Sequence, residues 1–458
     1  MARTQLLLAS TLYGMATLAA AVDAGALPPA DRRVLVVSNN AGVPETHDAP
    51  DRAPGFEPLR GRFDKVVSWN EAIRPLHPGG WSPRTDEVPM WERYFRQLWQ
   101  LGEDDLDLVV ESLQVAPALS FAQVFTGAPI TVYADGLMSY GPTRNKLGLL
   151  VDTRIDALLH LDLVPGLEPL LLSEFQVPSR VVPSAEFTKV LAEVADATRG
   201  FGAADPADPV DALPRDAALL LGQYLSALGI LSVEEEERLH LSLVRGAVAL
   251  GHRKLVFKPH PTAPSHWLEP LRQEARTLGA ELTVLDTPVL AEVVYQRARP
   301  ALVAGCFSTA LLTASALYGI PVARSGTKLL LDRLAPYQNS NRVPVTIVHA
   351  LLPDISDAAA VRAWTPPSPE QVAADLTPLL HTVGYCMQAE AYPHLRAEAE
   401  AWLAAHLGPG VQPYFKRRRL TSLGLPGALP PKRSLVPRVR AVRQVARGAR
   451  ALKKATLG

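Results

Sequence analysis

Cysteine is the scarcest residue type in this 458-residue chain, with Cys306 and Cys386 as the only two. Two cysteines cannot build the disulfide framework of a small secreted domain, and their scarcity fits a reducing compartment. The formal net charge is zero, which argues against a dedicated nucleic-acid-binding protein. A hydrophobic content of 48% is enough for large cores, and the length favours two domains plus an extension. We therefore expect a cytoplasmic protein that binds no nucleic acid.

Several motifs are also missing. No G-x-G-x-x-G sequence follows the first apolar strand, and the chain has neither a Walker sequence nor an H-E-x-x-H helix. No Asp-x-Asp pair stands in a convincing metal-binding loop. Asp104–Asp105 precedes an expected strand, and Glu234–Glu237 begins an expected helix, where a run of acids usually lies on a solvated face. The sequence thus predicts chemistry that needs neither a metal ion nor a bound cofactor.

The apolar N-terminal stretch LLLASTLYGMATLAAAV, residues 6–22, has two interpretations. It could serve as a secretory signal. The interpretation that we favour is a strand at Gln5–Ser10, a helix at Leu12–Ala24 with apolar residues at helical spacing, and a second strand within Arg32–Asn40. Together these form a βαβ unit. No other segment reaches the length of a membrane-spanning helix.

Strands and helices alternate through both halves of the chain, which predicts parallel sheets covered on both faces. In the first half we expect further strands at Lys65–Ser68, Asp107–Glu111, Ile130–Tyr133 and Ala157–Leu163, with helices at Pro89–Leu101, Pro117–Phe125 and Ser184–Ala195. In the second half we expect strands at Ala217–Gly222, Lys254–Lys258, Glu281–Leu285, Ala301–Ala304 and Pro321–Arg324. The expected helices there are 232–250, opened by a Ser232–Glu235 capping box, then Ser265–Leu278, Val289–Arg297 and Thr309–Tyr318.

The Pro-, Gly- and Asp-rich segment Gly200–Pro214 has no periodicity and separates the two halves. The predicted fold is therefore α/β, with two Rossmann-like, doubly wound domains at residues 1–203 and 215–350, a linker at 204–214 and a central cleft between the domains. Ligands bind such folds at the carboxyl ends of the strands. Residues 351–412 are expected to hold closing helices, at Pro369–Val383 and Ala389–Leu407, and residues 413–458 form a basic C-terminal extension.

Two loops at expected strand ends carry groups suited to acid–base chemistry. Asp135 follows a strand in YADGLMSYG and could act as a general base on a hydroxyl; alternatively, Asp135–Gly136 is an ordinary turn dipeptide. The sequence VFKPHP places Lys258 and His260 next to Pro261, and its prolines restrict the backbone. An ammonium and an imidazole suit an anionic leaving group, although this segment could equally be an ordinary basic loop.

Two further loops are candidates for phosphate or nucleotide binding. Gly305 ends a strand, and Ser308 and Thr309 then open a helix whose free N–H groups and dipole favour an anion. Ser308 could also serve only as the helix cap. Gln223 follows another strand of the same sheet, where it either contacts a nucleotide or packs within the loop.

In the order Asp135–Gly136, His260–Pro261 and Phe307–Ser308–Thr309, the chain resembles the bacterial polysialyltransferase-like glycosyltransferases, in a branch associated with actinobacteria. Bacterial sialyltransferases share an acidic pair followed by Gly, a His-Pro and a Ser-Ser or Ser-Thr. The resemblance extends over about residues 4–350. It implies a GT-B fold, an acceptor-side domain at 1–203, a donor domain at 215–350 and a CMP-activated sialic acid as the donor.

The resemblance also implies roles for individual residues: Asp135 as general base, His260 assisting departure of the CMP phosphate, and Ser308 and Thr309 binding that phosphate. The acidic pair is incomplete, because Ala134 stands where the first acid is expected. If that first acid were the catalytic one, the protein would be a weak or inactive transferase, unless Glu111 takes its place. The expected partners are a nucleotide-sugar donor and a glycan or lipid-linked acceptor. A UDP-sugar enzyme or epimerase, and a non-catalytic subunit of a glycan assembly system, remain alternatives.

The tail is strongly basic, with 13 Lys or Arg and no Asp or Glu from Lys416 to Gly458. Val442, Val445, Ala449 and Leu452 fall on one helical face. One interpretation is a surface helix on an anionic membrane, each basic residue contributing roughly 1 kcal/mol. The other is a solvated tail without fixed structure. The first would place the protein at the inner membrane face, where capsule or wall polymers are made.

Overall fold

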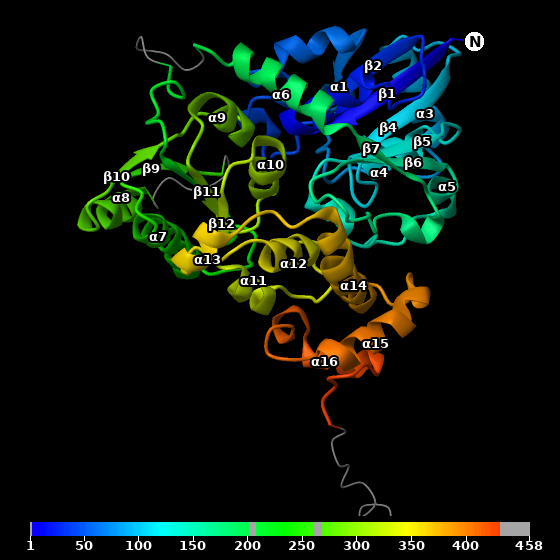
Figure 1. The fold of residues 1–458 in the computed structure, drawn as a ribbon. Coiled ribbons are helices and arrows are strands. Elements are labelled where there is room, and N and C mark those ends of the chain that lie inside the picture. Colours follow the sequence, from blue (N-terminus) through cyan, green and yellow to red (C-terminus); the bar gives the residue numbers. More distant parts are fainter. Residues whose placement is uncertain (1, 201–207, 261–267, 431–458) are drawn as a thin grey trace, which may run out of the picture.

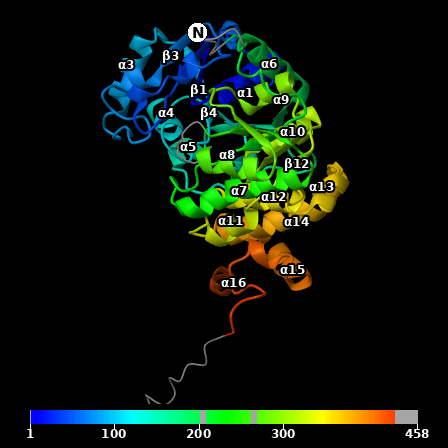
Figure 2. The same cartoon turned by 90° about the vertical axis from the view of Figure 1, so that its left-hand side faces the viewer.

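The computed structural model describes residues 2–200, 208–260 and 268–430, and it contains two parallel β-sheets, each covered by helices (Figures 1 and 2). Pro261, the linker residues 201–207 and the tail residues 431–458 lie outside the described residues. The fold is α/β with two doubly wound halves, as the alternating pattern predicts.

The first sheet has seven parallel strands in the order β3-β2-β1-β4-β5-β6-β7. They are β1 (Arg3–Ala9), β2 (Arg32–Val37), β3 (Lys65–Ser68), β4 (Asp105–Glu111), β5 (Ile130–Ala134), β6 (Ile155–Leu161) and β7 (Ser179–Val182). Because β1 pairs with both β2 and β4, the strand order reverses at β1, which is where doubly wound sheets bind ligands. The βαβ interpretation of the N-terminus is confirmed: Arg3–Ala9 is the central strand and its helix follows directly.

Alternate residues of β1 point to opposite sides of the sheet. Because the side chains on both sides are apolar, helices pack on both faces. Leu7 shares a core with α1 (Leu12–Asp23) and α6 (Ser184–Ala197). Leu6 and Leu8 pack on the other side, in a core rich in aromatic side chains. That core is contributed by α2 (Trp69–Ile73), α3 (Val88–Leu98) and α4 (Ala118–Val124), and the short α5 (Leu149–Asp152) adds Val151.

The second sheet has five parallel strands in the order β10-β9-β8-β11-β12, so its order reverses at β8. The strands are β8 (Ala218–Leu221), β9 (Lys254–Lys258), β10 (Glu281–Val284), β11 (Leu302–Gly305) and β12 (Val322–Arg324). The helices are α7 (Val233–Ala249), α8 (Leu268–Thr277), α9 (Ala291–Ala298), α10 (Thr309–Tyr318) and α11 (Thr327–Arg333). The predicted Ser232–Glu235 capping box opens α7.

The C-terminal helices return to the first half and end at the pole farthest from the N-terminus (Figures 1 and 2). They are α12 (Arg342–Leu351), α13 (Ala358–Ala363), α14 (Pro369–Met387), α15 (Arg396–His406) and α16 (Arg417–Leu423). After α14, the Tyr392 hydroxyl donates to Leu170 O at 3.0 Å and accepts from Thr143 N at 3.1 Å. The expected helix Ala389–Leu407 is wrong over its first seven residues, because a turn and a short 3-10 helix starting at Pro393 precede α15.

Among the described residues, no helix combines the length and the apolar character that crossing a bilayer requires.

Candidate active site

A cleft of about 510 Å³ lies between the carboxyl ends of the two sheets and takes residues from both. Its walls include side chains at the ends of four different strands: Glu111 and Asp135 from the first sheet, and His260 and Ser308 from the second. Parallel strands deliver their loops to one edge, so residues separated by almost 200 positions in sequence meet here. The sequence-based expectation that these loops share one cleft is met by the geometry.

The wall formed by the first sheet, which we call the N-terminal wall, holds two carboxylates. Glu111 ends β4 and Asp135 directly follows β5. The Ser10 hydroxyl, just after β1, donates to Glu111 Oε2 at 2.8 Å, which fixes this carboxylate at the point where the strand order reverses. Burial raises the pKa of Glu111 to about 7, and the nearby Asp135 charge adds to the increase while the Ser10 hydrogen bond opposes it. Burial also raises the pKa of Asp135 to about 6.

The acidic pair that the sequence motif lacks is thus assembled in space from two strands. Ala134 occupies the position of the missing acid and lines the cleft without charge. Gly14, in the first turn of α1, permits the close approach: a Cβ there would lie 3.0 Å from the Tyr133 hydroxyl and 3.4 Å from Asp135 Oδ2. The N-terminal end of α1 therefore lies against Asp135.

The wall formed by the second sheet, which we call the C-terminal wall, includes the first turn of α10. Ser308 is its cap, and the hydroxyl accepts a hydrogen bond from Ala310 N at 3.2 Å. Thr309 stands directly opposite the N-terminal wall, because a Cβ added to Gly136 would lie 3.2 Å from Thr309 Oγ1. The two walls are therefore in near contact, with a carboxylate on one side and a helix N-terminus on the other. Such a helix end favours a phosphate.

The loop after β8 is held by a buried carboxylate. Glu236 accepts the backbone N–H groups of Leu225 at 2.6 Å and Ser226 at 2.8 Å. Its neighbour His240 accepts the Gln223 N–H through Nε2 at 3.0 Å, and burial lowers the pKa of His240 to about 4. The expectation that Glu234–Glu237 is a solvated face is therefore wrong for Glu236, which is fully buried. Gln223 and Tyr224 line the cleft as a result.

His260 lies in the cleft with its ring stacked on Tyr224, the ring centres 4.0 Å apart. Burial and the neighbouring Lys258 lower the pKa of His260 to about 4, so the imidazole is neutral at pH 7. Lys258 is 8% exposed and does not line the cleft. Burial lowers its pKa to about 8, against the opposing effect of Glu292. Lys258 therefore keeps most of its positive charge at neutral pH, behind the imidazole.

The structure brings together Asp135, Gln223, His260, Ser308 and Thr309 among the predicted residues. Gly305 and Lys258 lie behind the cleft; a Cβ on Gly305 would lie 3.2 Å from Leu221 Cβ, so Gly305 serves the packing of β11 on β8. Tyr224, which follows Gln223 in the same loop, also lines the cleft, whereas sequence reasoning missed the role of Glu236 and missed Arg144, which reaches the cleft from the loop after η4 (Leu137–Tyr140). Within the described ranges, no group of three or more His, Cys, Asp and Glu side chains is arranged to hold a metal ion.

The family model for alpha-2,8-polysialyltransferase (POLYST) matches residues 5–327, which is well over half of the chain. The chain belongs to this family. The match spans both sheets and includes every cleft residue discussed above. Family membership makes the protein a glycosyltransferase, whereas α12 to α16 lie beyond the matched residues. Comparison with curated proteins gives no match.

Several solved structures resemble this polysialyltransferase-family protein at low sequence identity. UDP-GlcNAc 2-epimerase from Neisseria meningitidis is 10% identical, with 87% of this chain and 94% of that chain covered and a TM-score of 0.45. The corresponding epimerase from Methanocaldococcus jannaschii is 13% identical, with coverages of 70% and 83% and a TM-score of 0.42. MurG from Acinetobacter baumannii is 12% identical, with coverages of 88% and 98% and a TM-score of 0.39.

Proposed function

We propose that this glycosyltransferase moves sialic acid, or a related nonulosonic or ulosonic acid, from a CMP-activated donor to a cell-surface glycan in one inverting, metal-independent step. The observation that carries the proposal is the opposition of Asp135 and Glu111 to the N-terminus of α10 across one cleft. Such a reaction needs a base for the acceptor hydroxyl and stabilisation of charge on the departing phosphate. The two walls supply one requirement each.

Asp135 is the proposed general base. In the reaction, the acceptor oxygen bonds to the anomeric carbon, its proton passes to Asp135, and the bond from that carbon to the phosphate oxygen breaks with its electron pair leaving on CMP. A pKa of about 6 leaves Asp135 mostly ionised at pH 7 while keeping it a better base than a free aspartate. The Asp135 charge helps to raise the pKa of Glu111 to about 7, so Glu111 takes up the first proton as the pH falls and Asp135 stays ionised to lower pH.

The leaving phosphate would bind to the α10 N-terminus. The Ser308 and Thr309 hydroxyls and the free backbone N–H groups of the first turn are suitable donors. The neutral His260 can donate a hydrogen bond, and the arrival of a dianionic phosphate raises the pKa of the imidazole and makes protonation easier. Lys258 adds positive charge from behind. These groups stabilise the phosphate without a metal ion.

The nucleotide that the protein binds most strongly distinguishes this proposal from its alternatives. Purified protein is mixed with CMP, CDP, UDP or GDP, and its melting temperature is measured; only a ligand of the folded state raises it. We expect CMP to give the largest increase, and CMP-sialic acid to release CMP in the presence of glycan acceptors. A larger increase with UDP would favour a UDP-sugar enzyme instead. No increase with any nucleotide would favour a non-catalytic subunit of a glycan assembly system.

The proposed setting is the cytoplasm, at the inner membrane face if the basic residues 413–458 bind anionic lipid. Most of that segment lies outside the described residues. Binding of the full chain to vesicles with and without phosphatidylserine, compared with a chain ending at residue 430, tests this part separately.

A further inference from the structure

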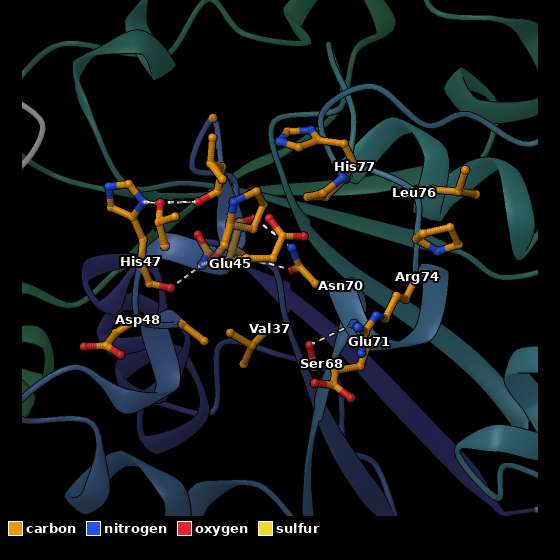
Figure 3. A pocket seen from close by; sticks show the side chains of 18 of the residues that line it. Val37, Glu45, His47, Asp48, Ser68, Asn70, Glu71, Arg74, Leu76 and His77 are labelled. Carbon is orange, nitrogen blue, oxygen red and sulfur yellow. Dashed lines mark hydrogen bonds between the residues drawn. The ribbon is translucent and has the colours of Figure 1, made fainter.

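A second cavity opens at the carboxyl ends of β2 and β3, on the same edge of the first sheet as Asp135 (Figure 3). We call it the β2–β3 pocket. Its volume is about 570 Å³, and its lining comes from residues 37–52 and 68–78. The size is that of a site for a small ligand or a short oligosaccharide. His77–Pro78, a dipeptide that the catalytic cleft does not use, belongs to this pocket.

The pocket has a fixed polar frame. Asn39 N–H donates to Asn70 Oδ1 at 2.8 Å, and Asn70 Nδ2 donates to Asn39 O at 2.9 Å, so the ends of the two strands are joined reciprocally. His77 Nδ1 accepts the Gly79 N–H at 3.1 Å, which leaves Nε2 as the protonated nitrogen that donates to Ala41 O at 3.0 Å. The ring is neutral in this arrangement.

Charged side chains surround this frame without partners of their own. Glu45, Asp48, Glu71, Arg52 and Arg74 are in the lining, and none of these side chains forms a hydrogen bond or an ion pair with another described residue. Glu45, Asp48, Glu71 and Arg74 lie around the hollow in Figure 3. Three carboxylates outnumber two guanidinium groups in the lining, which gives its acidic and basic side chains an excess of one negative charge.

One loop joins this pocket to the catalytic cleft. Asn39 lines the pocket and the next residue, Asn40, lines the cleft, with the Ser38 hydroxyl donating to Asn40 Oδ1 at 2.7 Å. In the sheet order, two strand spacings separate β2 from β4 and four separate β3 from β5. At about 4.8 Å per spacing, the two sites are roughly 10 to 19 Å apart along the edge. A single extended glycan can occupy both.

We propose that the β2–β3 pocket binds the acceptor several sugar residues away from the attacking hydroxyl, and that it takes an uncharged, polyhydroxylated glycan. This inference rests on the proposed transfer reaction and names its acceptor class. Carboxylates accept hydrogen bonds from sugar hydroxyls, and guanidinium groups donate to them, so a mixed lining suits neutral sugars. A chain of sialic acids would place one carboxylate per residue against a wall with excess negative charge, which disfavours it.

Two matched tryptophan substitutions test the site. Gly42 lines the pocket, and a Cβ added there would meet no atom within 4 Å, so Gly42→Trp introduces a bulky ring at the pocket wall from a position with open space. Gly127 also has open space around its Cβ position but precedes β5, at the opposite edge of the sheet, so Gly127→Trp is the control. Neither glycine has a positive φ that would strain the new residue. A third variant, Glu45→Gln with Glu71→Gln, removes two of the three carboxylates.

The first measurement needs no donor: saturation-transfer NMR of the full chain with neutral di- to tetrasaccharides and with short α2,8-linked sialic acid oligomers. We expect binding of at least one neutral oligosaccharide, lost in Gly42→Trp and kept in Gly127→Trp, with weaker binding of the sialic acid oligomers. The carboxylate double variant should weaken neutral-glycan binding and strengthen that of the oligomers. Preferred binding of the sialic acid oligomers by the wild-type protein, or equal binding in both tryptophan variants, overturns the inference.

The second measurement is CMP release from CMP-sialic acid with and without the acceptor so found. Gly42→Trp should raise KM for the acceptor at least 10-fold and leave acceptor-independent hydrolysis of the donor unchanged. Unchanged acceptor KM in Gly42→Trp contradicts the acceptor site. The absence of both donor hydrolysis and transfer in every protein, with glycan binding intact, instead contradicts the proposed donor chemistry.

Discussion

The N-terminal wall of the cleft presents carboxylates, whereas the C-terminal wall presents hydroxyls, an imidazole, a helix N-terminus and a buried ammonium behind them. Burial acts on these walls in opposite directions. It raises the pKa of Glu111 and Asp135 and lowers that of His260 and Lys258. Each wall therefore carries less charge at neutral pH than its composition suggests, because desolvation disfavours the charged form of acids and bases alike.

This difference between the walls suits each of them to a different part of the proposed reaction. In the proposed reaction, the carboxylates of the N-terminal wall accept the proton of the acceptor hydroxyl. The hydroxyls, the imidazole and the helix N-terminus of the C-terminal wall stabilise the negative charge of the departing phosphate. A substitution in the N-terminal wall should therefore change the rate, whereas one in the C-terminal wall should change nucleotide affinity. The predictions below test that division.

The largest effect is expected from Asp135→Asn. Loss of the general base should lower kcat by roughly 10²- to 10⁴-fold while leaving CMP affinity within a factor of two or so. The matched control is Asp162→Asn: Asp162 directly follows β6, and burial raises its pKa as well, but it does not line the cleft. The measurement is CMP release in a coupled assay together with a CMP titration. Equal kcat values for the two variants would show that Asp135 is not the base.

Ser308→Ala tests the other wall. Loss of a hydrogen bond to a charged phosphate costs about 1.5–3 kcal/mol, so CMP should bind roughly 10- to 100-fold more weakly. Loss of the helix cap by itself costs about 1 kcal/mol of stability. Ser368→Ala separates the two effects, since Ser368 caps α14 outside the cleft. Thermal unfolding should report similar losses for both variants, and calorimetric titration should report weaker CMP binding for Ser308→Ala alone.

Most of the fold behind this comparison was predictable from the sequence, because buried parallel strands leave continuous apolar runs and the connecting helices follow them. The runs around Leu6–Leu8 and Val34–Val37 gave β1 and β2 nearly to the residue. The edge strand β7 was missed because only one of its four residues is buried, so its sequence shows no apolar run. The start of α15 was placed too early because helix-forming residues continue through the turn before Pro393.

The site was predictable only in part, for a physical reason. Asp135, His260 and Ser308 follow strands, and strand ends of one sheet share an edge, so their meeting could be anticipated. Glu111 could be named only as a possible substitute, because its pairing with Asp135 depends on the neighbouring register of β4 and β5. Glu236 could not be distinguished from the acids beside it, since its role depends on backbone N–H groups that a folded loop turns toward it.

The pH dependence sharpens the description of the N-terminal wall. A general base works when ionised, so the rate should fall as pH drops through the pKa of the pair, between about 7 and 6. In Glu111→Gln the titration step near 7 is gone and only the Asp135 step near 6 remains, which moves the midpoint of this limb to lower pH. Gln can still accept the Ser10 hydrogen bond. Rate profiles from pH 5 to 8 are the measurement, and an unchanged midpoint would mean that the two groups titrate independently.

Gly136→Ala should have the smallest effect, and it measures how closely the walls approach. Gly136 has φ −142° and ψ 179°, an extended conformation that alanine adopts without strain. The added Cβ would lie 3.2 Å from Thr309 Oγ1, so one wall must yield by a few tenths of an ångström. If catalysis requires the walls to stay at this separation, kcat/KM should fall by two- to fivefold with little change in melting temperature. Gly148→Ala, where the new Cβ meets no atom within 4 Å, is the control. A fully active Gly136→Ala protein would mean that the reacting cleft is wider than the one described here, and that the donor phosphate sits between walls that have moved apart.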